Sequence, residues 1–151
     1  MLTTQLVDPI IKAALKEDVG GKDITSTALI PRALHFKADI EAKEKGVLCG
    51  IAIAERVFRL VDENIRFLPV GKDGDLLEKG REVAYIEGSG SSILIAERTA
   101  LNFLSRLSGI ATRTRQFVDK VRGTEAKILD TRKRRPHCGF WKNTQLKPGA
   151  A

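Results

Sequence analysis

The chain has 151 residues, 42% of them hydrophobic, which suits one domain with a core plus a fragment of another, and no apolar run reaches the roughly 18 residues of a membrane span. Its formal net charge of +7 lies at one end, because residues 1–112 carry 15 basic and 16 acidic side chains whereas residues 113–151 carry 11 and 3. That basic stretch lacks the aromatic-interleaved motif of an RNA-binding fold, so we expect a small-anion site or a chance cluster and no nucleic-acid partner.

The first predicted element is an amphipathic helix. Apolar residues at helical spacing occupy positions 6–15, the Asp8-Pro9 pair suits a helix start, and Gly20-Gly21 ends the pattern. This N-terminal stretch has neither a basic region nor a small-residue cleavage site, so we expect a cytoplasmic protein. A half-buried strand follows over residues 35–42, where apolar and polar side chains alternate.

The middle of the chain predicts a helix and a set of short strands joined by turns. We expect these elements over residues 53–61 (helix), 65–69 (strand with Pro at a sheet edge), 71–75 (turn), and 76–80 and 83–88 (paired strands). The last pair is typical of the compact β sandwiches of biotinyl and lipoyl carriers. A carrier needs a modified lysine at a hairpin tip, but the flanks of Lys72, Gly71 and Asp73, form neither recognition motif.

The last third predicts helices and one strand. We expect a flexible joint over Gly88–Ser92, a long helix after it that Gly109 interrupts, a further helix to Gly123, and a short strand over Lys127–Asp130. The fold class is therefore α+β. An N-terminal α/β sandwich (hammerhead-like, related to barrel-sandwich carriers) with its long helix spans residues 1–110, and residues 111–133 begin an incomplete α/β barrel.

Three segments carry a resemblance to a known family. Residues 17–25 read EDVGGKDIT, residues 97–112 read ERTALNFLSRLSGIAT, and residues 130–133 read DTRK. In order and spacing they resemble quinolinate phosphoribosyltransferase, also called carboxylating nicotinate-nucleotide pyrophosphorylase. The likeness covers residues 1–133, and its central segment is long and specific.

The resemblance implies the function and the site. Members of the family join quinolinate to phosphoribosyl pyrophosphate with Mg²⁺, yielding nicotinate mononucleotide, pyrophosphate and CO₂ in NAD biosynthesis, and they act as homodimers. It implies that Arg98 reaches into the partner subunit's site and that Thr131, Arg132 and Lys133 contact substrate. It also implies that Asp18 and Asp23 are structural. The family's metal-holding acids lie downstream without a counterpart here, so no catalytic set is complete and this truncated chain is expected to be inactive alone.

Each substrate contact also has a plainer interpretation. Arg98 could form a helix-surface ion pair with Glu97, and Arg132 and Lys133 could belong to a solvated charge run. Cys49 and Cys138 show no metal-binding spacing. Two other functions stay open for the whole chain. One is the related pyrophosphorylase of molybdenum-transport operons, and the other is a non-catalytic dimerisation module.

Residues 134–151 do not follow the family pattern. Codons taken one nucleotide earlier would place glutamate at Lys142 and lysine at Asn143, and would permit Gly-Gly-Gly over the last three residues, as in the family. Our hypothesis is a frameshift near the Lys133 codon, which would leave this tail without a selected function. Sequencing the coding DNA tests this hypothesis. If it is correct, deleting one base near the Lys133 codon restores an open reading frame into a barrel domain, and if no such deletion does so, the hypothesis is wrong.

Overall fold

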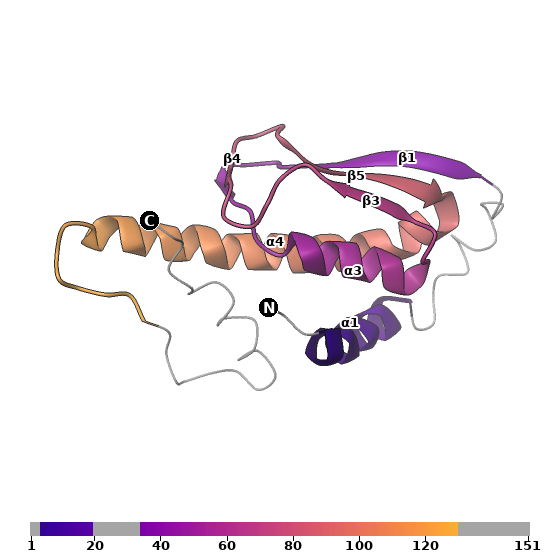
Figure 1. Cartoon of the computed structure of the whole chain (residues 1–151), viewed down its shortest axis with the longest axis horizontal. Helices are drawn as coiled ribbons and strands as arrows, with labels where there is room; N and C mark the ends of the chain where they lie inside the picture. Colours follow the sequence, from indigo (N-terminus) through magenta and orange to yellow (C-terminus); the bar gives the residue numbers. More distant parts are fainter. Residues whose placement is uncertain (1–3, 20–33, 130–151) are drawn as a thin grey trace.

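The computed structural model describes residues 4–19 and 34–129, and it is an α+β fold in which short strands precede one long helix (Figure 1). Its elements are α1 (Thr4–Val19), β1 (His35–Glu41), β2 (Gly46–Val47), α3 (Ile51–Val61), β3 (Arg66–Pro69), β4 (Leu76–Leu77), β5 (Glu82–Ser89) and α4 (Gly90–Val121). The fold class and the order of elements up to α4 therefore confirm the prediction. No closed barrel is present within the described ranges.

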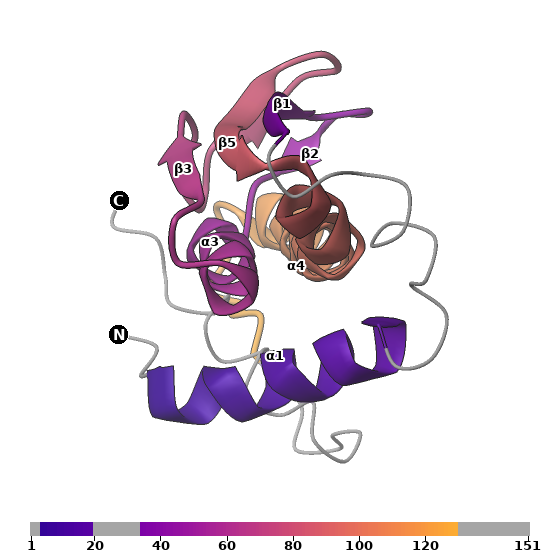
Figure 2. The same ribbon diagram turned by 90° about the vertical axis from the view of Figure 1, so that its right-hand side faces the viewer.

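An antiparallel sheet forms one layer of the molecule. Its strand order is β1-β5-β3, with His35 opposite Ser89 and Arg66 opposite Glu87, and β2 pairs with β4 in a second, two-stranded sheet. β3 lies at the sheet edge and ends in Pro69, as the sequence predicts, because proline cannot donate to a neighbouring strand. The sheet covers α3 and α4, which lie side by side beneath it (Figures 1 and 2).

The core lies between the sheet and this helix pair. α3 buries Ala54, Val57 and Phe58 completely, and the Phe58 ring packs against Phe67 of β3 with the two centroids 5.7 Å apart. β5, the central strand, contributes Val83, Ala84 and Ile86 to the core. Burial of this apolar face is the main force that holds the two layers together.

α1 crosses below α3 and α4 (Figure 2) and is attached by both apolar and charged contacts. Val7 and Ile11 are buried, and the guanidinium of Arg56 on α3 donates two hydrogen bonds to Asp8, at 2.8 and 2.6 Å. This pairing holds the pKa of the Asp8 carboxyl below its usual value. The predicted start at Asp8-Pro9 is wrong, since α1 begins at Thr4 and Pro9 lies inside it on the exposed side.

The N-terminus of α3 is capped from a distant turn. Gly50 precedes the helix with φ 99°, a conformation that favours glycine, and offers no side chain to cap it. Asp73 supplies the acceptor instead, because its Oδ1 accepts hydrogen bonds from the backbone N–H groups of Gly50 and Ile51 at 2.8 and 3.0 Å. The predicted turn at residues 71–75 thus has a structural role, which weighs against a carrier hairpin at Lys72.

The predicted joint at Gly88–Ser92 is absent. β5 runs to Ser89 and α4 begins at Gly90, without an intervening loop. A Cβ on Gly88 would lie 3.0 Å from Ile65, and one on Gly90 would lie 2.7 Å from the Phe36 ring. These glycines therefore permit close packing at a sharp strand-to-helix change rather than a flexible hinge.

The predicted helix break at Gly109 is also wrong. α4 is one helix of 32 residues, Gly90–Val121, and it runs through Gly109 without a break. The expected strand at Lys127–Asp130 is not formed over residues 127–129, which pair with no strand of the described ranges. Asp130 lies outside the described residues. Within the described ranges, no helix combines the length and apolar character needed to cross a bilayer.

Candidate functional site

The structure places one of the predicted site residues. Arg98 lies in the first third of α4 with its side chain exposed. Thr131, Arg132 and Lys133 lie outside the described residues, as does Asp23. Among the ion pairs of the described ranges Arg98 has none, so the surface pair with Glu97 is not formed. An arginine without a carboxylate partner keeps all its N–H donors available for a ligand.

The hydroxyl groups of the same motif are used by the fold. Thr99 is 1% exposed and donates a hydrogen bond of 2.6 Å to the carboxylate of Asp18 on α1. Thr112 Oγ1 accepts the backbone N–H of Val47 at 2.8 Å. These contacts bind α1 and β2 to opposite flanks of α4.

Ser108 repeats this pattern one turn earlier. Its Oγ accepts the N–H of Cys49 at 3.0 Å and donates to the Cys49 carbonyl oxygen at 3.3 Å. One hydroxyl group of α4 therefore binds both backbone polar groups of Cys49. Together with Thr112, Ser108 brackets Gly109 and explains why the helix does not break there. Sequence reasoning missed these roles, although hydroxyl residues recurring on the flanks of an apolar helix face were a visible signal.

The remaining polar residues of the motif face outward. α3, the sheet and α1 occupy three sides of α4, and within the described residues no element covers the fourth (Figure 2). The exposed residues there follow one another at helical spacing: Arg98, Asn102, Ser105, Arg106 and Gly109. We call these five residues the outward face of α4. Its charge is +2, with no acid among them.

A groove runs beside the outward face. It has a volume of about 510 Å³ and lies between α4 and the loop from β1 to β2. Its floor is apolar, with Leu48, Leu77 and Leu104, and its rim includes Ser105 and Gly109 of the outward face. The loop lysines Lys43 and Lys45 pair with Glu41 and Glu78, and the groove is also lined by Glu44 of the loop and Arg113 of α4.

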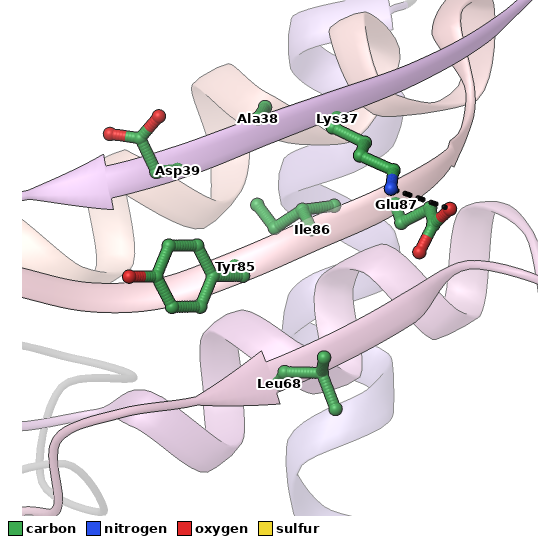
Figure 3. A pocket seen from close by; sticks show the side chains of 7 residues that line it. All are labelled: Lys37, Ala38, Asp39, Leu68, Tyr85, Ile86 and Glu87. Carbon is green, nitrogen blue, oxygen red and sulfur yellow. Dashed lines mark ion pairs between the residues drawn. The ribbon is translucent and has the colours of Figure 1, made fainter.

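The outer surface of the sheet carries a smaller hollow of about 300 Å³ (Figure 3). Leu68, Tyr85 and Asp39 lie along it, and Lys37 pairs with Glu87 at 3.7 Å. Opposite charges compensate each other here, and the hollow is open to solvent. It offers no concentrated charge for an anionic ligand, which leaves the outward face of α4 as the candidate site.

Comparisons with known proteins identify the family to which the chain is similar. The family described as "Quinolinate phosphoribosyl transferase, N-terminal domain" matches residues 23–108. The decarboxylating quinolinate phosphoribosyltransferase 1 of Nicotiana glauca is 42% identical over 128 residues, which cover 84% of this chain and 36% of that protein. The probable carboxylating nicotinate-nucleotide pyrophosphorylase of Bacillus subtilis is 42% identical over 120 residues, which cover 80% and 41%.

Solved structures show the same fold. The NadC protein of Streptococcus pyogenes matches with a TM-score of 0.89 and 40% identity, covering 94% of this chain and 50% of that one. The nicotinate-nucleotide pyrophosphorylase of Francisella tularensis matches with a TM-score of 0.86 and 30% identity, covering 96% and 51%. This chain therefore spans about half the length of these solved relatives and 36–41% of the curated ones.

A sheet backed by two helices, with a long helix that carries the motif of residues 97–112, defines an N-terminal domain of a phosphoribosyltransferase. The chain belongs to the quinolinate phosphoribosyltransferase family.

Proposed function

We propose that this chain is the N-terminal portion of a carboxylating nicotinate-nucleotide pyrophosphorylase of NAD biosynthesis. Such an enzyme takes quinolinate and phosphoribosyl pyrophosphate to nicotinate mononucleotide, pyrophosphate and CO₂. The observation that carries the proposal is that Arg98 is exposed and has no partner within the described residues. The next residue, Thr99, holds this part of α4 in place through its hydrogen bond to Asp18. The family membership of the chain supports the choice of reaction.

The proposed role of Arg98 is to bind a substrate carboxylate in another subunit. Quinolinate carries two adjacent carboxylates, and a guanidinium binds a carboxylate through two parallel N–H donors. Because Arg98 lies on the side of α4 that no described element covers, these donors point away from the described fold. A homodimer would bring them to the partner subunit's site, where Thr131, Arg132 and Lys133 of that subunit would complete the substrate contacts.

The described residues include no group of three or more His, Cys, Asp or Glu side chains that could hold a metal ion. Mg²⁺ would arrive with phosphoribosyl pyrophosphate and be held by the portion of the relatives that this chain does not span. We propose a cytoplasmic location, although the names of some plant relatives include "mitochondrial" or "chloroplastic".

Mixed dimers test the proposal. An intact family enzyme whose arginine at the position matching Arg98 is replaced by alanine is co-purified with this chain and supplied with quinolinate, phosphoribosyl pyrophosphate and Mg²⁺. We expect nicotinate mononucleotide formation to be restored, because this chain contributes the missing guanidinium. The pure chain is expected to give no turnover alone.

The matched controls are two variants of this chain. Arg98→Ala should restore nothing, whereas Arg115→Ala should restore as much as the unmodified chain, because Arg115 is already paired with Asp119. Equal restoration by Arg98→Ala would contradict the proposed role. A failure of the chain to co-purify would contradict the proposed dimer.

One observation favours a second function, a non-catalytic dimerisation module. α4 extends beyond the sheet (Figure 1), and this extension exposes Phe117 and Val118 to 45% and 40%. Exposed neighbouring apolar side chains are typical of an interaction surface. A chain that co-purifies with the intact enzyme but restores no activity would favour this function over the first.

A further inference from the structure

The outward face of α4 carries a second arginine that no partner engages. Arg106 follows Arg98 by eight residues, which places the two side chains about 80° apart around the helix and about 12 Å apart along its axis. Within the described residues neither forms an ion pair or a hydrogen bond, and both are exposed. The other arginines of α4 differ in this respect.

Those arginines are each held by a neighbour. Arg115 and Arg122 both contact Asp119, at 3.0 and 2.9 Å. Arg113 donates to the Gln116 side chain at 3.1 Å and lies 5.2 Å from the centroid of the Phe117 ring. The absence of partners is therefore specific to Arg98 and Arg106 and is not a general property of this helix.

The residues between the two arginines suit a small anion. Asn102 and Ser105 are exposed and present an amide and a hydroxyl group. Gly109 has open space where a Cβ would stand, so a ligand can approach the helix closely. None of the five residues of the outward face has an apolar side chain, although the exposed Leu94 lies one turn before Arg98.

We propose that Arg106, with Asn102, binds a phosphate or pyrophosphate group next to the carboxylate contact of Arg98. The proposal rests on the proposed function, which supplies phosphoribosyl pyrophosphate as the physiological phosphate compound and pyrophosphate as the product. The outward face of one subunit then contacts both anionic substrates, the dicarboxylate through Arg98 and the phosphorylated sugar through Arg106. A guanidinium is well suited to this task because its planar donors match two phosphate oxygens.

Titration of the ¹⁵N-labelled 151-residue chain with inorganic pyrophosphate, at low ionic strength and without Mg²⁺, tests the proposal. We expect saturable shifts of the backbone amide signals of residues 98–109. Arg106→Gln should weaken binding roughly tenfold, the effect of one charge-assisted hydrogen-bond contact. Arg115→Gln, a change of the same charge on the same helix, should leave the affinity within about twofold.

The proposal would be overturned if the unmodified chain gave no saturable shifts, or if the shifts avoided residues 98–109. It would also be overturned if Arg106→Gln and Arg115→Gln weakened pyrophosphate binding equally, because equal weakening would indicate nonspecific attraction. Should Arg106→Gln unfold the chain, Arg106→Lys keeps the charge and removes the planar fork, and it should still weaken binding. Because pyrophosphate binding by this chain is measured without catalysis, its failure is separate from a failure of Arg98 in the mixed dimers.

Discussion

At the scale of single residues, the motif of α4 over residues 97–112 divides into two chemical groups. Thr99, Ser108 and Thr112 are hydrogen-bonded to other elements, whereas Arg98 and Arg106 have no partner within the described ranges. The first group stabilises the fold, and the second is free to bind ligands. Residue identity in the motif therefore does not by itself indicate a substrate contact.

The hydroxyl of Thr99 provides a test of this division. Thr99→Val keeps the shape of the buried side chain but removes the donor to Asp18. We expect a loss of about 1 kcal/mol in the free energy of unfolding, the usual net contribution of one hydrogen bond. Urea denaturation measures it, and Thr99→Ser, which retains the hydroxyl, should lose less. Equal stability of the valine variant and the unmodified chain would show that the contact contributes nothing.

At the scale of elements, the helices are joined by carboxylates that accept hydrogen bonds across them. Asp62, just after α3, accepts the backbone N–H of Asn64 and the hydroxyl of Ser92 on α4, at 3.0 and 2.9 Å. These hydrogen bonds, first that of Asn64 and then that of Ser92, lower the pKa of the Asp62 carboxyl. The link between α3 and the start of α4 consequently depends on the ionised carboxylate.

This dependence has a definite sign. A carboxyl whose pKa is lower in the folded state stabilises the fold fully above its unfolded pKa, about 3.9, and loses that contribution as the pH falls through the folded value. We expect the urea midpoint of the unmodified chain to fall more steeply below about pH 4 than that of Asp62→Asn. Asp39→Asn, on the exposed side of β1, is the control. Parallel curves for the unmodified chain and Asp62→Asn would contradict the role of Asp62.

The type and order of the elements were predicted from local patterns, but several of their boundaries and the contacts between distant elements were not. The alternation over residues 35–42 correctly placed Ile40 in the core because a strand has a period of two. The Gly109 break was wrong because the roughly 1 kcal/mol cost of a helical glycine is outweighed by the bonds of Ser108 and Thr112. The Thr99 bond to Asp18 joins residues 81 positions apart, a distance at which local patterns carry no information.

The candidate site was predictable only through family resemblance. Arg115 and Arg122 lie four and three residues from Asp119, a spacing at which helical side chains meet, whereas no acid stands three or four residues from Arg98. Spacing thus indicates that Arg98 has no partner within its helix, but it assigns no ligand to it. The second unpaired arginine, Arg106, belongs to the same motif and was not predicted as a contact, because the resemblance assigned it no role.

At the scale of the whole molecule, the chain combines a closed two-layer core with a helix that extends beyond it (Figure 1). The chain spans about half the length of its solved relatives. The extension exposes Phe117 and Val118, apolar side chains of the kind that a compact domain buries.

This exposure predicts self-association. Light scattering of the purified chain should give a concentration-dependent mass above the 16.6 kDa of one copy. Replacing both Phe117 and Val118 by serine should shift the mass towards the monomer, because these side chains are 45% and 40% exposed on the extension. Leu76→Ser, at an exposed position on β4, should not have this effect. A clean monomer at every concentration would contradict the prediction.

The central claim is that α4 supplies Arg98 to the substrate site of another subunit. The most direct measurement is the rate of nicotinate mononucleotide formation by mixed dimers of this chain with an intact family enzyme that lacks the matching arginine. We predict a rate at least roughly tenfold higher with the unmodified chain than with Arg98→Ala, as expected for a bidentate guanidinium–carboxylate contact. Equal rates with the two chains would contradict the claim.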